Sequence, residues 1–230
     1  MEIYHILNRG VDKRQIFLEE KDYLRFIHNL FEFNDKFNTY NINYSINKHG
    51  YIDNIDIGCR YIEKEKKPRH ILVKILAFTL MPNHYHLLLS PVVENGVPKF
   101  MQKLNMGYSK YFNQKYKREG ALFQSKYKKI LVNEDKHLIH LPYYIHLNPL
   151  DLSFPGWRTG EIQNFESAIK FLENYKWSSF LDYIGIKNFP SVTHREFLLN
   201  FLGGEKNYKE DIIKWLKERD INEIKEFALE

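Results

Sequence analysis

Two histidines separated by one residue stand in the stretch Ile71 to Pro91. This stretch holds two apolar runs divided by Met81-Pro82-Asn83, a turn signal typical of a hairpin. His84 and His86 fall on the second arm. Because side chains alternate along a strand, both imidazoles are expected on one face and the intervening Tyr85 on the other. Two such imidazoles form half of a metal site, although histidines in strands are more often structural.

A phenol and an amide follow at residues 133 to 149. Asn133 is a suitable N-cap, apolar residues recur at helical spacing, and the pattern predicts a helix bent near Pro142. On this helix Tyr144 and Asn148 are four residues apart and share a face. Tyr144 could therefore bring a phenol, and Asn148 an amide oxygen, to the same ion.

The residue types alone leave a second interpretation open. Tyr143 and Tyr144 could both be packing residues, and Asn148 could be a helix C-cap. His140 lies four residues before Tyr144 and shares its face, so it is a reserve ligand or general base, with a structural role favoured.

Four motifs occur together in an informative order: Asn8-Arg9-Gly10, the segment Met81 to His86, the segment Tyr144 to Pro149, and Trp177-Ser178-Ser179. In this order they resemble the single-tyrosine HUH transposases, with REP-associated tyrosine transposases as the most similar branch. HUH denotes two histidines around a bulky hydrophobic residue, here Tyr85. The resemblance extends to about Gly185.

The resemblance implies an enzyme that cuts and rejoins single-stranded DNA. Tyr144 would be the nucleophile and form a 5′-phosphotyrosine link. His84, His86 and Asn148 would bind a divalent ion, Mg²⁺ or Mn²⁺. The expected DNA is single-stranded and hairpin-forming, and the resemblance also implies a homodimer.

The expected fold is α+β. Strands and helices follow in the order β, α, β, β, α, β, which predicts a ferredoxin-like split βαβ domain with a central antiparallel sheet. We expect this domain at residues 1–150, with an inserted hairpin or loop at about 32–70 that carries short strands around Gly50. Residues 151–230 are expected to form a C-terminal, mostly helical extension. Gly10 indicates a tight turn after the first strand.

Positive charge is concentrated in the first 160 residues, which carry 24 Lys/Arg against 16 Asp/Glu, whereas residues 161–230 carry 10 against 13. From Met101 to Val132 the cations alternate with aromatic residues, a pattern that suits stacked bases and phosphates, although half of these aromatic residues are expected to face the core. The residues expected to contact DNA are Arg9, Lys13, Arg14, Lys110, Arg118, Lys126 and Lys128.

Composition narrows the location and the class of protein. The single cysteine, Cys59, allows no internal disulfide and is typical of a cytoplasmic protein. No apolar run reaches the roughly 18 residues of a membrane span, and the N-terminus shows no secretory signal, so no membrane partner is expected.

Three other functions share features with this sequence. A replication initiator or relaxase could use the same site, but the short chain and the lack of an NTPase loop favour a transposase. A domesticated DNA-binding protein without catalysis is the alternative from another class. A structural zinc protein is disfavoured because only one cysteine is present.

Overall fold

The computed structural model describes residues 1–37, 59–62 and 65–218. Its main sheet has four antiparallel strands in the order β4-β5-β1-β6. The expected strands around Gly50 and the chain after residue 218 lie outside the described residues. The strands are β1 (Ile3–Arg9), β2 (Cys59–Ile62), β3 (Glu65–Pro68), β4 (Val73–Met81), β5 (His84–Pro91) and β6 (Lys128–Val132).

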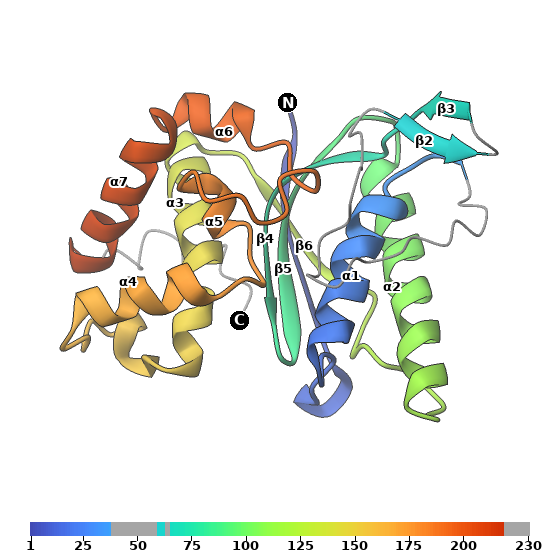
Figure 1. The fold of residues 1–230 in the computed structure, drawn as a ribbon, viewed down its shortest axis with the longest axis horizontal. Helices are drawn as coiled ribbons and strands as arrows, with labels where there is room; N and C mark the ends of the chain where they lie inside the picture. Colours follow the sequence, from blue (N-terminus) through green and yellow to red (C-terminus); the bar gives the residue numbers. More distant parts are fainter. Residues whose placement is uncertain (38–58, 63–64, 219–230) are drawn as a thin grey trace.

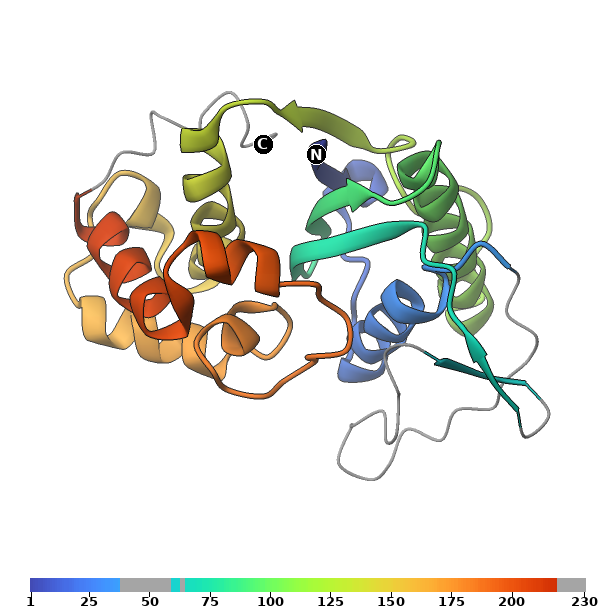
Figure 2. The ribbon, with the colours of Figure 1, turned by 90° about the horizontal axis from the view of Figure 1, so that it is seen from above.

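Helices cover both faces of this sheet, as Figures 1 and 2 show. Helices α1 and α2 lie on one face, and the C-terminal helices gather with α3 on the other. The helices are α1 (Glu20–Glu32), α2 (Gly96–Lys115), α3 (Asp135–Leu147), α4 (Phe165–Asn174), α5 (Phe180–Tyr183), α6 (Glu196–Phe201) and α7 (Gly204–Glu218), and the short 3-10 helices are η1 (Val11–Lys13), η2 (Asn148–Leu152) and η3 (Pro155–Arg158).

The topology confirms the α+β, ferredoxin-like prediction. Apart from the β2–β3 hairpin, the first six elements of the domain run β1, α1, β4, β5, α2, β6, and β1 pairs with both β5 and β6. The hairpin falls within the expected insertion, and its two strands pair antiparallel. No helix in the described part of the chain is long and apolar enough to cross a membrane.

Two hydrophobic clusters, one on each face, hold these layers together. Alternate residues of β5 separate them, because Leu88 packs with α3 and the C-terminal helices, whereas Leu87 and Leu89 pack with α1 and α2. Since α3 shares its cluster with α4–α7, the extension after residue 150 forms part of the layer on its face of the sheet. The domain boundary at 150 stays a prediction.

Two local expectations were wrong in detail. Helix α3 begins at Asp135 with Glu134 as its N-cap, one residue later than the expected cap at Asn133. Gly10 has an extended backbone with φ −60°, so its conformation does not require glycine. Space requires it instead, because a Cβ at Gly10 would come within 2.3 Å of the Arg14 carbonyl oxygen.

Candidate active site

The two histidines lie on β5 in the middle of the sheet, where neighbouring strands fix their positions. His84 pairs with Arg9 of β1, and His86 pairs with Leu7. Both are buried, and their ring centroids are 5.1 Å apart. Tyr85 points to the opposite face, where its hydroxyl donates to Asn105 of α2, so the predicted alternation is confirmed.

Each of these histidines has a hydrogen bond on Nδ1. His84 Nδ1 lies 2.6 Å from Asn83 Oδ1, an acceptor, so this nitrogen carries the proton. His86 Nδ1 lies 2.9 Å from Nε2 of His5, whose ring stacks on it with centroids 5.1 Å apart. Hydrogen bonds of this kind fix the orientation and tautomer of histidines that bind metals through Nε2.

Tyr144 comes to the histidines from α3 on the same face of the sheet. Thr79 of β4 donates its hydroxyl to the Ile145 carbonyl at 2.7 Å, which attaches the helix next to β5. The Tyr144 ring meets the His86 ring edge-on, with centroids 5.9 Å apart. Asn148 lies at the C-terminal end of α3, and its Nδ2 donates to the Tyr144 carbonyl at 2.8 Å. The structure therefore brings His84, His86, Tyr144 and Asn148 together, while their chemical roles stay predictions.

A guanidinium from the C-terminal extension completes this cluster. Arg158 Nη1 donates to the Tyr144 hydroxyl at 3.0 Å, and Nη2 donates to Asn148 Oδ1 at 2.9 Å. Arg158 is itself held by Asp151, with Nη2 2.7 Å from Oδ2. Asp151 in turn accepts from the Trp157 indole at 2.6 Å.

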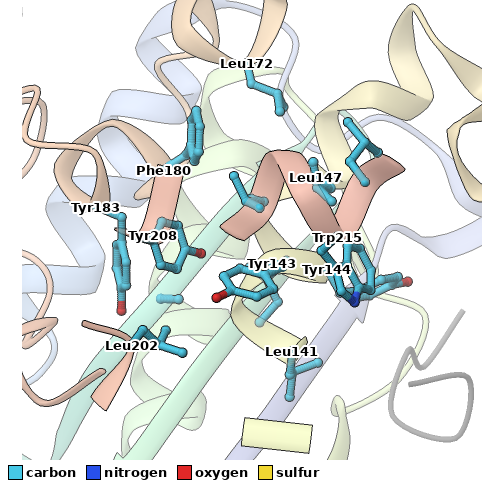
Figure 3. Packing of buried hydrophobic residues seen from close by; sticks show 14 of the residues in the cluster. Leu141, Tyr143, Tyr144, Leu147, Leu172, Phe180, Tyr183, Leu202, Tyr208 and Trp215 are labelled. Carbon is cyan, nitrogen blue, oxygen red and sulfur yellow. The ribbon is translucent and has the colours of Figure 1, made fainter. Parts of the chain in front are cut away.

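The neighbouring tyrosine points elsewhere. Figure 3 shows Tyr143 among the residues that pack α3 against α7, close to Tyr208 and Trp215. Burial, with contributions from Asp211, raises the pKa of the Tyr143 phenol well above its ordinary value. Tyr143 is thus a packing residue, whereas Tyr144 adjoins the histidines.

The environment keeps His86 neutral. Burial, together with the charges of Arg158 and Arg9, lowers the pKa of His86 to about 3. A neutral imidazole is the form that binds a metal. Among the described residues no group of three or more His, Cys, Asp or Glu side chains forms a metal cluster. The predicted ligand set does not belong to this class of cluster, because it consists of two imidazoles and one amide.

Two of the three histidines of α3, His140 and His146, serve packing. The reserve candidate His140 accepts a hydrogen bond from the Trp215 indole of α7 at 3.3 Å. His146 is fully buried between Tyr208 and Ser179, with contacts of 2.6 and 2.7 Å. Ser179 belongs to the Trp177-Ser178-Ser179 motif, and its amide donates to the Phe78 carbonyl of β4.

The expected DNA-contacting cations occupy different faces. Arg9 lies opposite His84, and its Nε is buried with no hydrogen-bond partner among the described residues. Lys128 of β6 lies opposite Leu7, in the same row across the sheet as His86. Lys126 is exposed just before β6. Arg9 and Lys128 therefore border the histidine-bearing face, whereas the Lys126 carbonyl accepts from Asn8 and from Asn105 of α2 on the opposite side of the sheet.

The remaining cations lie elsewhere. Lys13 and Arg14 follow Gly10, and Arg14 forms an ion pair with Asp12 at 3.7 Å. Lys110 is exposed on α2, on the opposite face of the sheet. Arg118 follows α2 and donates to Asn113 at 3.0 Å. The backbone of Lys13 is nevertheless linked to the histidine site, because its carbonyl oxygen accepts from Asn83 Nδ2 at 3.2 Å and Asn83 Oδ1 bonds to His84.

Two tyrosines at the C-terminal end of α2 are held by a buried carboxylate. Asp22 of α1 accepts from Tyr111, Lys115 and Tyr116 at 2.9, 2.5 and 2.7 Å. Burial alone would raise the pKa of Asp22, but hydrogen bonds led by Lys115 and Tyr116 lower it below its ordinary value. These two tyrosines therefore join α1 to α2. This contact explains why they stand among the cations, with no need for a role in base stacking.

Sequence reasoning missed His5, Arg158, Asp151 and Trp157. His5 shares the strand of the Asn8-Arg9-Gly10 motif, and period-two alternation could have placed it on one face. Its pairing with the histidine strand depends on sheet order, which the sequence does not state. Arg158 lies in an irregular segment with no periodic pattern, so no signal pointed to it.

Comparison with known proteins identifies a family for this chain. A family model described as "Transposase IS200 like" matches residues 3–148. A solved structure titled "Structure of the REP associates tyrosine transposase bound to a REP hairpin" is similar over 82% of this chain and 82% of that chain, with 11% sequence identity and a TM-score of 0.45. That similarity is too low to support a conclusion. No curated protein matches the chain.

Proposed function

The chain belongs to the family of IS200-like transposases and is an HUH-type tyrosine transposase, and from this premise we propose that it cuts and rejoins single-stranded DNA through Tyr144. One observation supports this proposal above the others. The Tyr144 ring contacts the His86 ring, and its hydroxyl shares a guanidinium with the Asn148 side-chain oxygen. A nucleophile, two imidazoles and an amide thus meet on a strand and a helix, which are rigid supports.

The proposed reaction is an in-line displacement at phosphorus. Tyr144 Oη loses its proton and bonds to the scissile phosphorus, while the bond from phosphorus to the 3′-oxygen breaks. The 3′-oxygen takes up a proton and leaves as a hydroxyl, and the 5′-phosphate remains on Tyr144. A second 3′-hydroxyl can attack this link and release Tyr144, which transfers the strand with no external energy source.

The residues present fit a divalent ion. His84 and His86 have hydrogen bonds that fix their Nδ1 atoms, and His86 is neutral, as a ligand must be. Asn148 would supply an oxygen, the donor that Mg²⁺ and Mn²⁺ prefer. When bound, such an ion would offset negative charge on the phosphate. Arg158 donates to the Asn148 oxygen and so uses one of its two lone pairs.

We further propose that the substrate is single-stranded, hairpin-forming DNA and that the protein acts as a homodimer. The family assignment and the excess of positive charge in the first 160 residues support a DNA substrate. Arg9 and Lys128 are the expected cations best placed to hold phosphates near the site, because they border the histidine-bearing face.

A denaturing-gel assay tests the nucleophile. Labelled single-stranded hairpin DNA from the flanks of the gene is incubated with the protein and Mn²⁺ or a chelator. We expect a covalent protein–DNA band with Mn²⁺ only. Tyr144→Phe should abolish the band and retain non-covalent binding, because it removes only the attacking oxygen. Tyr143→Phe is the matched control and should retain the band.

Two results would contradict this proposal. Equal linkage by Tyr144→Phe would transfer the role to another residue. Non-covalent binding without any band, across several metals and flanking sequences, would favour the alternative of a DNA-binding protein without catalysis.

A further inference from the structure

Arg158 bonds to both of the atoms that have separate roles in the proposed reaction, the Tyr144 hydroxyl oxygen and the Asn148 amide oxygen. Its Nη1 lies 3.0 Å from the Tyr144 hydroxyl and its Nη2 lies 2.9 Å from Asn148 Oδ1. The guanidinium also lies over the Tyr144 ring, 5.1 Å from its centroid. A single cation thus connects the attacking oxygen with the amide oxygen offered to the ion.

The guanidinium is held in place before any substrate arrives. Asp151 accepts from Arg158 Nε at 3.1 Å and from Nη2 at 2.7 Å, while the Trp157 ring lies 4.6 Å from the guanidinium carbon. The side chains of Arg158 and Asp151 are 25% and 30% exposed, so this pair reaches the surface, although the Tyr144 residue is fully buried. A charged group placed in this way is preorganised for an incoming anion.

We propose that Arg158 is a further catalytic residue, which binds a non-bridging oxygen of the scissile phosphate; this inference rests on the proposed function. A phosphorus about to be attacked lies about 3 to 3.5 Å from the nucleophile. Arg158 Nη1 is 3.0 Å from that same oxygen. A non-bridging oxygen of that phosphate can therefore reach the guanidinium, whose planar fork matches phosphate oxygens.

Arg158 can bind the phosphate by a simple exchange of hydrogen bonds, and this exchange needs no other reactant. On substrate binding Arg158 gives up its bonds to Tyr144 and Asn148 and donates to the phosphate instead. Arg158 forms no covalent bond and transfers no proton. Its positive charge offsets the negative charge that the phosphate gains as Tyr144 attacks. The Asn148 oxygen is released in the same movement.

A substrate with an altered phosphate separates this role from a structural one. The probe is the hairpin oligonucleotide that the unmodified protein links, made with the normal phosphate or with each methylphosphonate diastereomer at the cut position. A methylphosphonate carries no charge. On normal DNA, Arg158→Ala should slow linkage by about 10² to 10³-fold. On at least one diastereomer, the unmodified protein and Arg158→Ala should react within a few-fold of each other.

Two controls accompany this comparison. Lys209→Ala breaks a remote ion pair of the same length, the 2.7 Å contact with Glu173, and should leave linkage unchanged. If Arg158→Ala does not fold, Arg158→Lys replaces it, because this variant keeps a cation beside Asp151. Because a lysine ammonium cannot reproduce the planar fork of a guanidinium, Arg158→Lys should still slow linkage of normal DNA at least tenfold.

The outcomes distinguish this inference from the proposed function. Equal slowing of Arg158→Ala on charged and uncharged phosphates, or full activity of the Arg158 variants on normal DNA, would overturn the role of Arg158 alone. Absence of linkage by the unmodified protein under every condition would overturn the proposed function, and the role of Arg158 with it.

Discussion

At the scale of single residues, His5 fixes the orientation of the His86 ring, which the HUH motif alone does not do. Its ring stacks on His86, and its Nε2 lies 2.9 Å from His86 Nδ1. If His86 binds a metal through Nε2, its Nδ1 donates the proton to His5. Second-sphere partners of this kind commonly contribute a factor of about 10 to 100 in metal affinity.

The first prediction concerns His5→Phe, which keeps a stacked ring and removes its hydrogen bond with His86. We expect the dissociation constant for Mn²⁺ to rise about tenfold or more, measured by titration calorimetry on DNA-free protein. His140→Phe is the control, because His140 contacts Trp215 of α7. Unchanged Mn²⁺ affinity in His5→Phe would mean that His5 does not orient His86.

At the scale of secondary structure elements, the Trp177-Ser178-Ser179 motif joins the sheet to the tyrosine helix. Ser179 Oγ accepts from the Phe78 amide at 2.9 Å and lies 2.7 Å from His146 Nε2. The motif therefore covers the outer edge of β4. It also fixes α3 through His146, a buried residue of that helix. Its structural role is visible even though it supplies no group to the site.

The second prediction compares the two serines of this motif. Ser179→Ala should lower the free energy of unfolding by about 2 to 3 kcal/mol, because it leaves buried polar groups of Phe78 and His146 with fewer partners. Ser178→Ala should cost less than about 1 kcal/mol, since the bond that Ser178 Oγ accepts from the Phe180 amide is long, at 3.3 Å. Urea unfolding of both variants measures the difference, and equal losses would contradict this account.

At the scale of the whole molecule, buried histidines make stability depend on pH. Burial, helped by Arg25, lowers the pKa of His28 to about 4. Burial lowers the pKa of His146 to about 3, and it also lowers the pKa of His86 to about 3. In the unfolded chain a histidine titrates near 6.5. The unfolded state therefore binds protons first as the pH falls, and the folded state loses stability.

The third prediction follows from this sign. The contribution of each neutral histidine is fully present above about pH 6.5 and declines by about 1.4 kcal/mol per pH unit between pH 6 and 4.5. Urea unfolding across that range should show this decline. In His146→Gln the slope should be smaller by about that amount, even though the variant is less stable at pH 7. An unchanged slope would show that folding does not lower the pKa of His146.

Much of the fold followed from local patterns. Alternating and helical periodicities predicted the strands around His84 and the helix that carries Tyr144, and the element order predicted the ferredoxin-like sheet. The helix ends differed by one or two residues, as at Asn133, because capping depends on local geometry. The aromatic residues among cations were harder to interpret, since Asp22, which holds Tyr111 and Tyr116, lies about ninety residues away in the chain.

By itself, the sequence determined that His84 and His86 share a face and that Tyr144 and Asn148 share another, because strand and helix periodicities are local properties. Only the tertiary structure decided that these faces meet, that His5 stacks on His86, and that Arg158 bonds to Tyr144 and Asn148. Such contacts depend on strand order and on the path of an irregular segment, which result from packing the whole chain around its core.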